Sequence, residues 1–310
     1  MTYPFPVDPE LTGLVIAYQN PEFVADKVLP FVGPILGKQE FKWWELDFAE
    51  GITPVDTRVG RKGTPNEVEF GATEKTASTE DYGLDDVVPA DDIANAPAGY
   101  NPLARAAQGV MDLVLLGREQ RVAGLVFNAG TYPAANKETL SGTSQWSHAD
   151  SDPIEDIVSA QDGLVMRANV LVLGRPVWTA LSTNPKILKA INRNSGDSGI
   201  ATRQAVADLF ELDEIVVGGA FANGAKKGQT ASISRIWGKH AALIRRDALA
   251  DGGQGRATFG FSRQYGTRVA GQIPEPKVGL RGATRVRAGM SVKELIMAPD
   301  LGFFFQNAAA

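Results

Sequence analysis

The sequence predicts an α+β protein in which a helix-and-strand module is inserted into an elongated frame of β-strands and one long helix. Three observations support this fold class. Residues 38–88 have the alternation and turn residues of a long polar hairpin, and residues 103–129 carry the longest helical pattern. Residues 151–257 then alternate between helix and strand before a β-like pattern returns. With 310 residues and 44% hydrophobic content, the chain can bury a sizeable core.

The first 37 residues are rich in proline and show little helical periodicity, so most of this segment is expected to be an extended arm. One short helix is predicted within it, over Asn20–Leu29. Asn20 would be its cap and Pro21 would lie in its first turn.

The hairpin that follows is the most unusual part of the chain. Phe41–Phe48 is aromatic-rich and partly alternating, which predicts a strand, and Asn66–Phe70 is the expected return partner. Glycines and prolines lie between them. A lone two-stranded hairpin is marginal in water. We therefore expect it to lie on a partner surface, most simply another copy of the chain; the alternative is that it folds back on its own domain.

Charge is distributed unevenly along the sequence. Residues 1–100 carry 18 acidic and 7 basic side chains, a net of −11, whereas residues 235–293 carry 12 basic and 3 acidic, a net of +9. These could be two faces that meet inside one fold, or complementary surfaces of neighbouring subunits. A nucleic-acid reader is less favoured because the whole chain is acidic and has no such motif. The candidates for contacts between subunits are charged residues of the hairpin: Arg58, Arg61, Lys62, Glu67 and Glu69.

The long helix is predicted from residues that recur on one face: Ala104, Ala107, Met111, Leu115, Val122 and Leu125. Arg105, Asp112 and Glu119 recur every seventh residue on another face, which we expect to be polar. Gly109 and Gly117 weaken the helix or permit a bend.

The inserted module begins with a clear helix start, because Asp152 can cap a helix that has Pro153 in its first turn. The remaining elements expected after it are helices at 175–181, 185–191 and 202–212 and strands at 169–174, 214–218 and 241–244. After about residue 257 the pattern is β-like, ending in Ser291–Gln306.

No catalytic, cofactor or metal site is expected. The chain has no cysteine, which excludes disulfides, thiolate zinc sites and cysteine nucleophiles. Its two histidines, His148 and His240, have no metal-ligand spacing and are expected to be structural or exposed. Gly196–Gly199 matches the tetrapeptide around a serine protease nucleophile, but no partners are recognisable. Gly219–Gly224 lacks the lysine of a phosphate-binding loop.

Two further classes are disfavoured. An acidic cluster lacks the spacing of a calcium loop, so an exposed or subunit-facing surface is favoured for its members: Glu80, Asp81, Asp85, Asp86, Asp91 and Asp92. No apolar run approaches a bilayer span, and the N-terminus lacks the plan of a signal peptide. We expect a protein made and kept in the cytosol, without a membrane partner.

Several phrases, taken in order, resemble the major capsid proteins of tailed bacteriophages, which share the Hong Kong 97-type fold. The phrases are Val24–Pro30, Thr57–Arg61, Asn66–Gly71, Arg118–Ala123, Leu140–Trp146, Ser151–Pro153, Leu171–Gly174 and Ile236–Lys239. They cover nearly the whole chain, and the order of arm, hairpin, long helix, inserted module and returning strands agrees with that family.

The resemblance implies four parts: an N-terminal arm (1–37), an extended loop (38–88) that lies over a neighbouring subunit, a peripheral domain (89–150 and 258–310) with the long helix, and an axial domain (151–257). Pentamers and hexamers would close into an icosahedral shell around double-stranded DNA, which is contacted non-specifically. Scaffolding, portal and decoration proteins are the implied partners, and the virion is the implied location after assembly in the host cytoplasm.

Some relatives join a hairpin lysine to an asparagine of the next subunit. Lys62 lies near the tip, but no matched asparagine or activating glutamate is seen, so no crosslink is expected. A separate scaffolding protein is expected, since the arm begins near Met1. The alternatives are a cellular nanocompartment shell, a small-molecule enzyme that uses the inserted module, and a tail or decoration protein.

Overall fold

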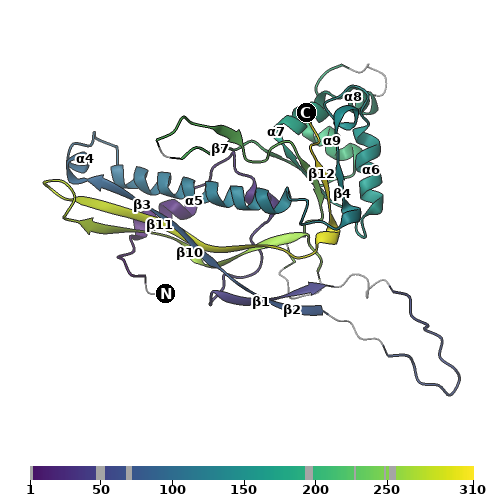
Figure 1. Cartoon of the computed structure of the whole chain (residues 1–310). Helices are drawn as coiled ribbons and strands as arrows, with labels where there is room; N and C mark the ends of the chain where they lie inside the picture. The colour runs from purple at the N-terminus through teal and green to yellow at the C-terminus, as the bar shows by residue number, and fades with distance from the viewer. Residues whose placement is uncertain are drawn as a thin grey trace.

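A long helix lies along a long antiparallel sheet, and together they form the elongated frame of the molecule (Figure 1). The helix is α5 (Pro102–Val126), capped by Asn101, whose side chain accepts from two backbone N–H groups of the first turn. The sheet has the order β10 (Gly260–Glu275), β11 (Ala283–Ile296) and β3 (Glu80–Pro89). This computed structural model describes residues 3–46, 53–67, 72–192, 198–226, 228–247, 249–250 and 256–310.

The core of the frame lies between α5 and β11. Every second residue of β11 is buried there, as the two-residue period of a strand requires: Val286, Ala288, Met290 and Val292. The predicted apolar face of the helix is confirmed. Its residues Ala107, Met111, Leu115 and Val122 are buried, and Ala104 and Leu125 are partly buried. Glu119 was placed on the polar face, and this was wrong, because it is fully buried.

The N-terminal segment contains more helix than its composition predicted. α1 (Pro9–Ala17) was missed, although Asp8 caps it by accepting from Glu10 N and Leu11 N. The second helix, α2 (Ala25–Val28), begins five residues after the expected cap. Asn20 lies too far before α2 to cap it: its side-chain oxygen accepts from Glu22 N, its amide donates to Asp112, and the first N–H groups of α2 bind elsewhere, as described below.

The hairpin is paired differently from the prediction. β1 (Glu40–Leu46) pairs along its whole length with β2 (Ala72–Ser78), so for these residues the choice of Asn66–Phe70 as return partner was wrong; residues 47–48 and 68–70 of the predicted pair lie outside the described residues. Ion pairs join Lys42 to Glu74 and Lys75 to Glu45 across the two strands, which favours this register. The chain then continues into β3, so the last residues of the expected loop at 38–88 are part of the long sheet.

The α/β module is built on a five-stranded mixed sheet (Figure 1). Its order is β4 (Lys137–Thr139), β12 (Gly302–Gln306), β9 (Ala241–Ile244), β5 (Val170–Gly174) and β6 (Glu214–Gly218). The helices of the module are α6 (Pro153–Gly163), α7 (Arg175–Thr183), α8 (Pro185–Asn192) and α9 (Arg203–Leu209). These elements confirm the local predictions, including the cap at Asp152.

This sheet also joins the module to the frame. Leu171 and Leu173 of β5 face the core beneath the module's helices, whereas Val170 and Val172 face a second core. That second core contains residues of α2 and of the last turns of α5. The remaining elements are short: α4 (Ala90–Ala94), three 3-10 turns at 134–136, 142–144 and 299–301, and the hairpin of β7 (Phe221–Asn223) and β8 (Ile233–Arg235).

The Trp237 side chain is buried in the core that lies between the frame and the module. Two parallel strands, β5 and β6, end in Gly174 and Gly218, and a Cβ on Gly218 would lie 2.1 Å from the Trp237 ring. Glycine at this strand end therefore leaves room for the indole.

Among the helices in the described ranges, none has the length and apolar composition that a membrane span requires.

Candidate functional site

The tip of the hairpin is exposed throughout. Every described residue from 53 to 67 is exposed, and Figure 1 shows this stretch projecting away from β1 and β2. Its turn is closed by Gly63 N, which donates to Gly60 O at 2.9 Å. The Asp56 carboxylate accepts from Arg58 N at 2.9 Å, and Asn66 donates to Asp56 O at 2.8 Å. These bonds are local, so they shape the tip without attaching it to a core.

Four of the five predicted contact residues lie in this tip. The side chains of Arg58, Arg61, Lys62 and Glu67 are exposed, and none of them forms an ion pair with any residue in the described ranges. The fifth, Glu69, lies outside the described residues. The tip therefore presents a cluster of three basic side chains that form no ion pair within the described part of the chain.

The base of the hairpin, by contrast, is firmly packed. Phe41 and Trp43 of β1 are buried in a small core with Val32, Phe261 and Met297. This core attaches β1 to β10 of the long sheet. The tip is consequently an extension held at one end only.

Part of the charge asymmetry of the sequence is resolved inside the chain, between β3 and β11. Asp85 accepts a bidentate pair of hydrogen bonds from Arg287, both at 2.7 Å, and a third from Arg285 at 3.3 Å. These hydrogen bonds, the one from Arg287 above all, hold the pKa of the Asp85 carboxyl below its usual range although burial opposes this. Lys293 donates to Glu80 at 2.6 Å in the same way. Thus the acidic strand β3 and the basic strand β11 compensate each other.

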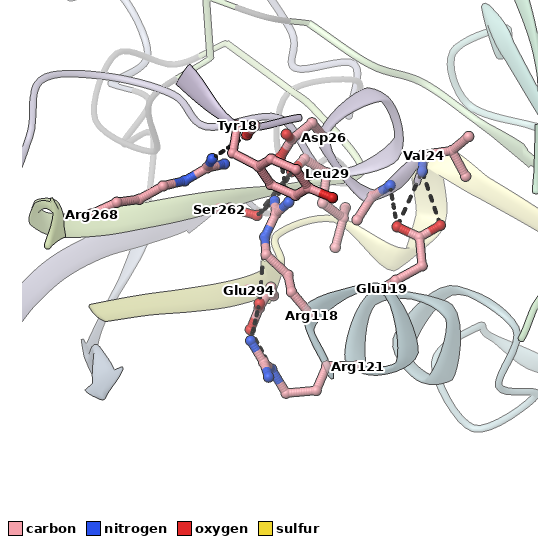
Figure 2. Close-up of polar contacts among 11 residues, drawn as sticks. Tyr18, Val24, Asp26, Leu29, Arg118, Glu119, Arg121, Ser262, Arg268 and Glu294 are labelled. Atoms are coloured by element: carbon pink, nitrogen blue, oxygen red, sulfur yellow. Dashed lines mark hydrogen bonds and ion pairs between the residues drawn. The ribbon is translucent and has the colours of Figure 1, made fainter. Parts of the chain in front are cut away.

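A buried polar junction, which the sequence analysis missed, lies where α5 meets the N-terminal segment (Figure 2). The carboxylate of Glu119 accepts from Val24 N at 2.9 Å, from Ala25 N at 2.8 Å and from the indole of Trp237 at 2.6 Å. Burial raises the pKa of Glu119, while these donors oppose the rise. One side chain therefore links α5, the start of α2 and the module.

Arg118 is the other central residue of this junction. Its guanidinium donates to Leu29 O and to the Ser262 hydroxyl, both at 3.1 Å, and pairs with Asp26 (Figure 2). It also lies 4.3 Å from the centre of the Phe31 ring, a cation–π distance. The side chain is only 2% exposed, so its charge depends on these partners.

The junction continues through Glu294 of β11. Arg121 donates to Glu294 at 2.9 Å, and the Arg118 Nε lies 3.7 Å from the same carboxylate. Each charged group named here has a charged or hydrogen-bonding partner in the chain itself, so the geometry supports a structural clamp. The sequence signal for this buried junction was a charged run inside an otherwise apolar half of the helix, Arg118-Glu119-Gln120-Arg121.

The other motifs have structural explanations. His240 accepts from Asn307 N at 3.0 Å, and burial lowers its pKa. His148 accepts from Asp150 N at 3.2 Å. In the phosphate-loop-like segment, Phe221–Asn223 is a strand of a hairpin, so no helix N-terminus follows the glycines. Of the protease-like tetrapeptide, Gly196 and Asp197 lie outside the described residues.

Comparison with known proteins agrees with this architecture. A family model described as Phage major capsid protein E matches residues 126–229. The chain is 54% identical over 307 residues to the major capsid protein of Pseudomonas phage JBD67, covering 99% of this chain and 98% of that one. It is 28% identical to the major capsid protein of Burkholderia phage BcepMu, covering 97% and 96% of the two chains.

Solved structures give the same fold at much lower identity. A phage-related protein from Bordetella bronchiseptica has a TM-score of 0.73 at 21% identity, with 99% of both chains covered. The putative capsid protein of an Escherichia coli CFT073 prophage has a TM-score of 0.58 at 12% identity, covering 98% of this chain and 99% of that one. The capsid of cyanophage P-SCSP1u gives 0.58 at 9% identity, covering 99% and 92%. The chain has the Hong Kong 97-type fold and belongs to the family of phage major capsid proteins.

Proposed function

We propose that this chain is the main shell subunit of a phage head, assembling as pentamers and hexamers into an icosahedral shell around double-stranded DNA. The exposed hairpin tip is the observation that carries the proposal. Residues 53–67 are all exposed, so little hydrophobic burial offsets the entropy of ordering them. A surface on a neighbouring copy would supply that gain.

The charges of the tip support the same assignment. Arg58, Arg61 and Lys62 have no ion-pair partner among the residues that the structure describes, whereas β3 and β11 use most of their charges within the chain. Asp86 and Asp92 remain on a groove of about 860 Å³ between β3 and α5 and have no ion-pair partner among the described residues. An acidic surface of this kind on a neighbour would fix the register of the basic tip.

The proposed division of the chain follows from this function. Residues 1–37 form the N-terminal arm, and the extended loop runs from residue 38 to the start of β3. The peripheral domain contains α5 and the long sheet, and the axial domain is the module at 151–257. Scaffolding, portal and decoration proteins and the packaged DNA are the proposed partners, with assembly in the host cytoplasm.

Two alternatives are less well supported. A cellular nanocompartment shell would use the same fold, but both curated relatives named above are phage major capsid proteins. A small-molecule enzyme would need polar groups that converge in a pocket. Arg118 and Glu119 line a cavity of about 540 Å³, but both already hold backbone groups of the N-terminal segment there.

Assembly of the purified chain tests the proposal. Negative-stain imaging and sedimentation of recombinant protein, with and without a co-expressed scaffolding protein, should show regular hollow particles. A protein that stays monomeric or dimeric in every condition would contradict the proposed function.

A further inference from the structure

The hairpin of β7 and β8 has an exposed face that is apolar and basic. Phe221 lies opposite Arg235 and Asn223 opposite Ile233, so Phe221 and Ile233 share one face. They are 51% and 68% exposed. The Arg235 guanidinium lies 4.3 Å from the centre of the Phe221 ring. A pairing of only three residues per strand is weak by itself, and this face has no cover from the described part of the chain.

A second exposed face lies on α6 and the residues after it. Glu155, Val158 and Asp162 follow one another at spacings of three and four, which places them on one side of the helix. Val165 and Met166 continue the apolar part, and the three apolar side chains are between 37% and 50% exposed. Neither Glu155 nor Asp162 forms an ion pair with a described residue.

The two faces have opposite charge. Residues 221–235 contain three basic and no acidic side chains, and residues 153–166 contain three acidic and no basic ones. Each also offers exposed apolar side chains at its centre. Burial of such side chains supplies most of the energy of a contact, while opposite charges fix its orientation.

The two faces also lie at opposite edges of the same sheet. The hairpin follows β6, one edge of the five-stranded sheet. Glu155 and Ser159 of α6 line a cavity together with Lys137 and Glu138 of β4, the other edge. Figure 1 shows β7 and α6 on opposite sides of the module. Different patches on opposite sides of a subunit give head-to-tail contacts, which close into a ring when the rotation between neighbours divides a full turn evenly.

We propose that the β7–β8 hairpin of one copy packs on the α6 face of the next copy around the axis of a pentamer or hexamer. Phe221 and Ile233 would cover Val158, Val165 and Met166, and Lys226 and Arg235 would face Glu155 and Asp162. This inference rests on the proposed shell function and names the surface that builds its rings.

The absence of cysteine gives a direct test. Chains carrying Val158→Cys and chains carrying Ile233→Cys are co-assembled and oxidised. Covalent dimers are expected from the mixture and not from either chain alone. A chain with both substitutions should give a ladder that ends at five or six subunits. The matched control pairs Val158→Cys with Ile16→Cys, which is 48% exposed on α1 and should not crosslink.

The outcomes separate the two proposals. If the wild-type chain forms no particles, the shell function fails. If particles form but the Val158 and Ile233 variants crosslink no more than the control, only the ring contact fails.

Hydrogen exchange of the unmodified protein provides a second measurement without substitutions. Amides of 153–166 and 221–235 should be protected in particles relative to free subunits, and unchanged exchange in both segments would overturn the ring contact.

Discussion

Arg118 and Glu119, consecutive residues of α5, bind opposite ends of the same short helix. Glu119 accepts from Val24 N and Ala25 N at the start of α2, and Arg118 donates to Leu29 O at its end. A helix of one turn has few internal hydrogen bonds and leaves its first N–H groups and last C=O groups to external partners. An anion at the start and a cation at the end also match the polarity of the helix.

Replacing Glu119 by Gln should therefore weaken the attachment of the N-terminal segment. An amide keeps the size of the side chain but turns one acceptor into a donor, so at least one of the three N–H groups loses its partner. A buried donor without a partner costs about 1–3 kcal/mol. Urea denaturation of unassembled subunits should show that loss, with faster hydrogen exchange at Val24 and Ala25. Glu10→Gln, at an exposed position of α1, is the control and should change neither.

Arg118 and Arg121 allow a matched comparison, because both pair with Glu294. Arg118 is 2% exposed and holds Leu29 and Ser262 as well, whereas Arg121 is 27% exposed. Breaking a buried ion pair from one side costs about 3–5 kcal/mol. Arg121 is partly exposed, and Glu294 keeps Arg118 nearby when Arg121 is replaced, so the loss of Arg121 should cost less. Arg118→Met should thus lower the free energy of unfolding more than Arg121→Met. Equal losses in urea denaturation would contradict the central role of Arg118.

Features with local causes were readable from the sequence. The cap at Asp152 with Pro153, the apolar period of α5 and the runs of β5 and β6 each depend on neighbouring residues, and each was predicted correctly. The same local signal, Asp8 followed by Pro9, begins α1 and was outweighed by the proline content of the segment.

The missed features depend on distant parts of the chain. The strand β1 pairs with β2, which lies farther along the chain than the alternating run at 66–70. Glu119 is buried because its carboxylate accepts hydrogen bonds from Val24, about 95 residues away, and from Trp237. The tip residues Arg58, Arg61 and Lys62 were proposed as contact residues from their charge and position, and a contact between copies leaves no pattern in the sequence of one chain.

The Asp85 network should make the long sheet sensitive to acid. The hydrogen bonds from Arg287 and Arg285 lower the pKa of Asp85 from its ordinary 3.8. A lowered pKa means that the stabilisation is present above the unfolded pKa and is lost as pH falls through the folded one. Asp85→Asn should lower the free energy of unfolding by about 0.5–1 kcal/mol near neutral pH, and its difference from wild type should shrink below about pH 4. Urea denaturation of both proteins across this pH range measures the difference. Asp86→Asn, which breaks no described ion pair, should show no such trend.

Replacing Gly218 and Gly109 by alanine should change the stability of the subunit in opposite directions. A Cβ on Gly218 would lie 2.1 Å from the buried Trp237 ring, so Gly218→Ala must displace the indole and its bond to Glu119. Overpacking of this kind costs about 1–3 kcal/mol. At Gly109, inside α5, a Cβ meets no atom within 4 Å, and alanine favours the helix by about 1 kcal/mol. The thermal unfolding temperature of the free subunit should therefore be lower than wild type for Gly218→Ala and higher than wild type for Gly109→Ala.

Reversing the charges of the hairpin tip should separate assembly from folding. Arg58 and Arg61 are exposed and form no described ion pair, so Arg58→Glu with Arg61→Glu should leave the unfolding of the free subunit within about 0.5 kcal/mol of wild type. The same change places two negative charges where the proposed acidic surface of a neighbour lies, and like charges at a contact oppose binding. Particle yield in sedimentation should fall strongly and recover in part at high salt, because salt screens exposed charges. Reversing Lys38, an exposed lysine at the base of the hairpin, provides the control for a general charge effect. Normal shells from the double variant would show that the basic tip does not direct assembly.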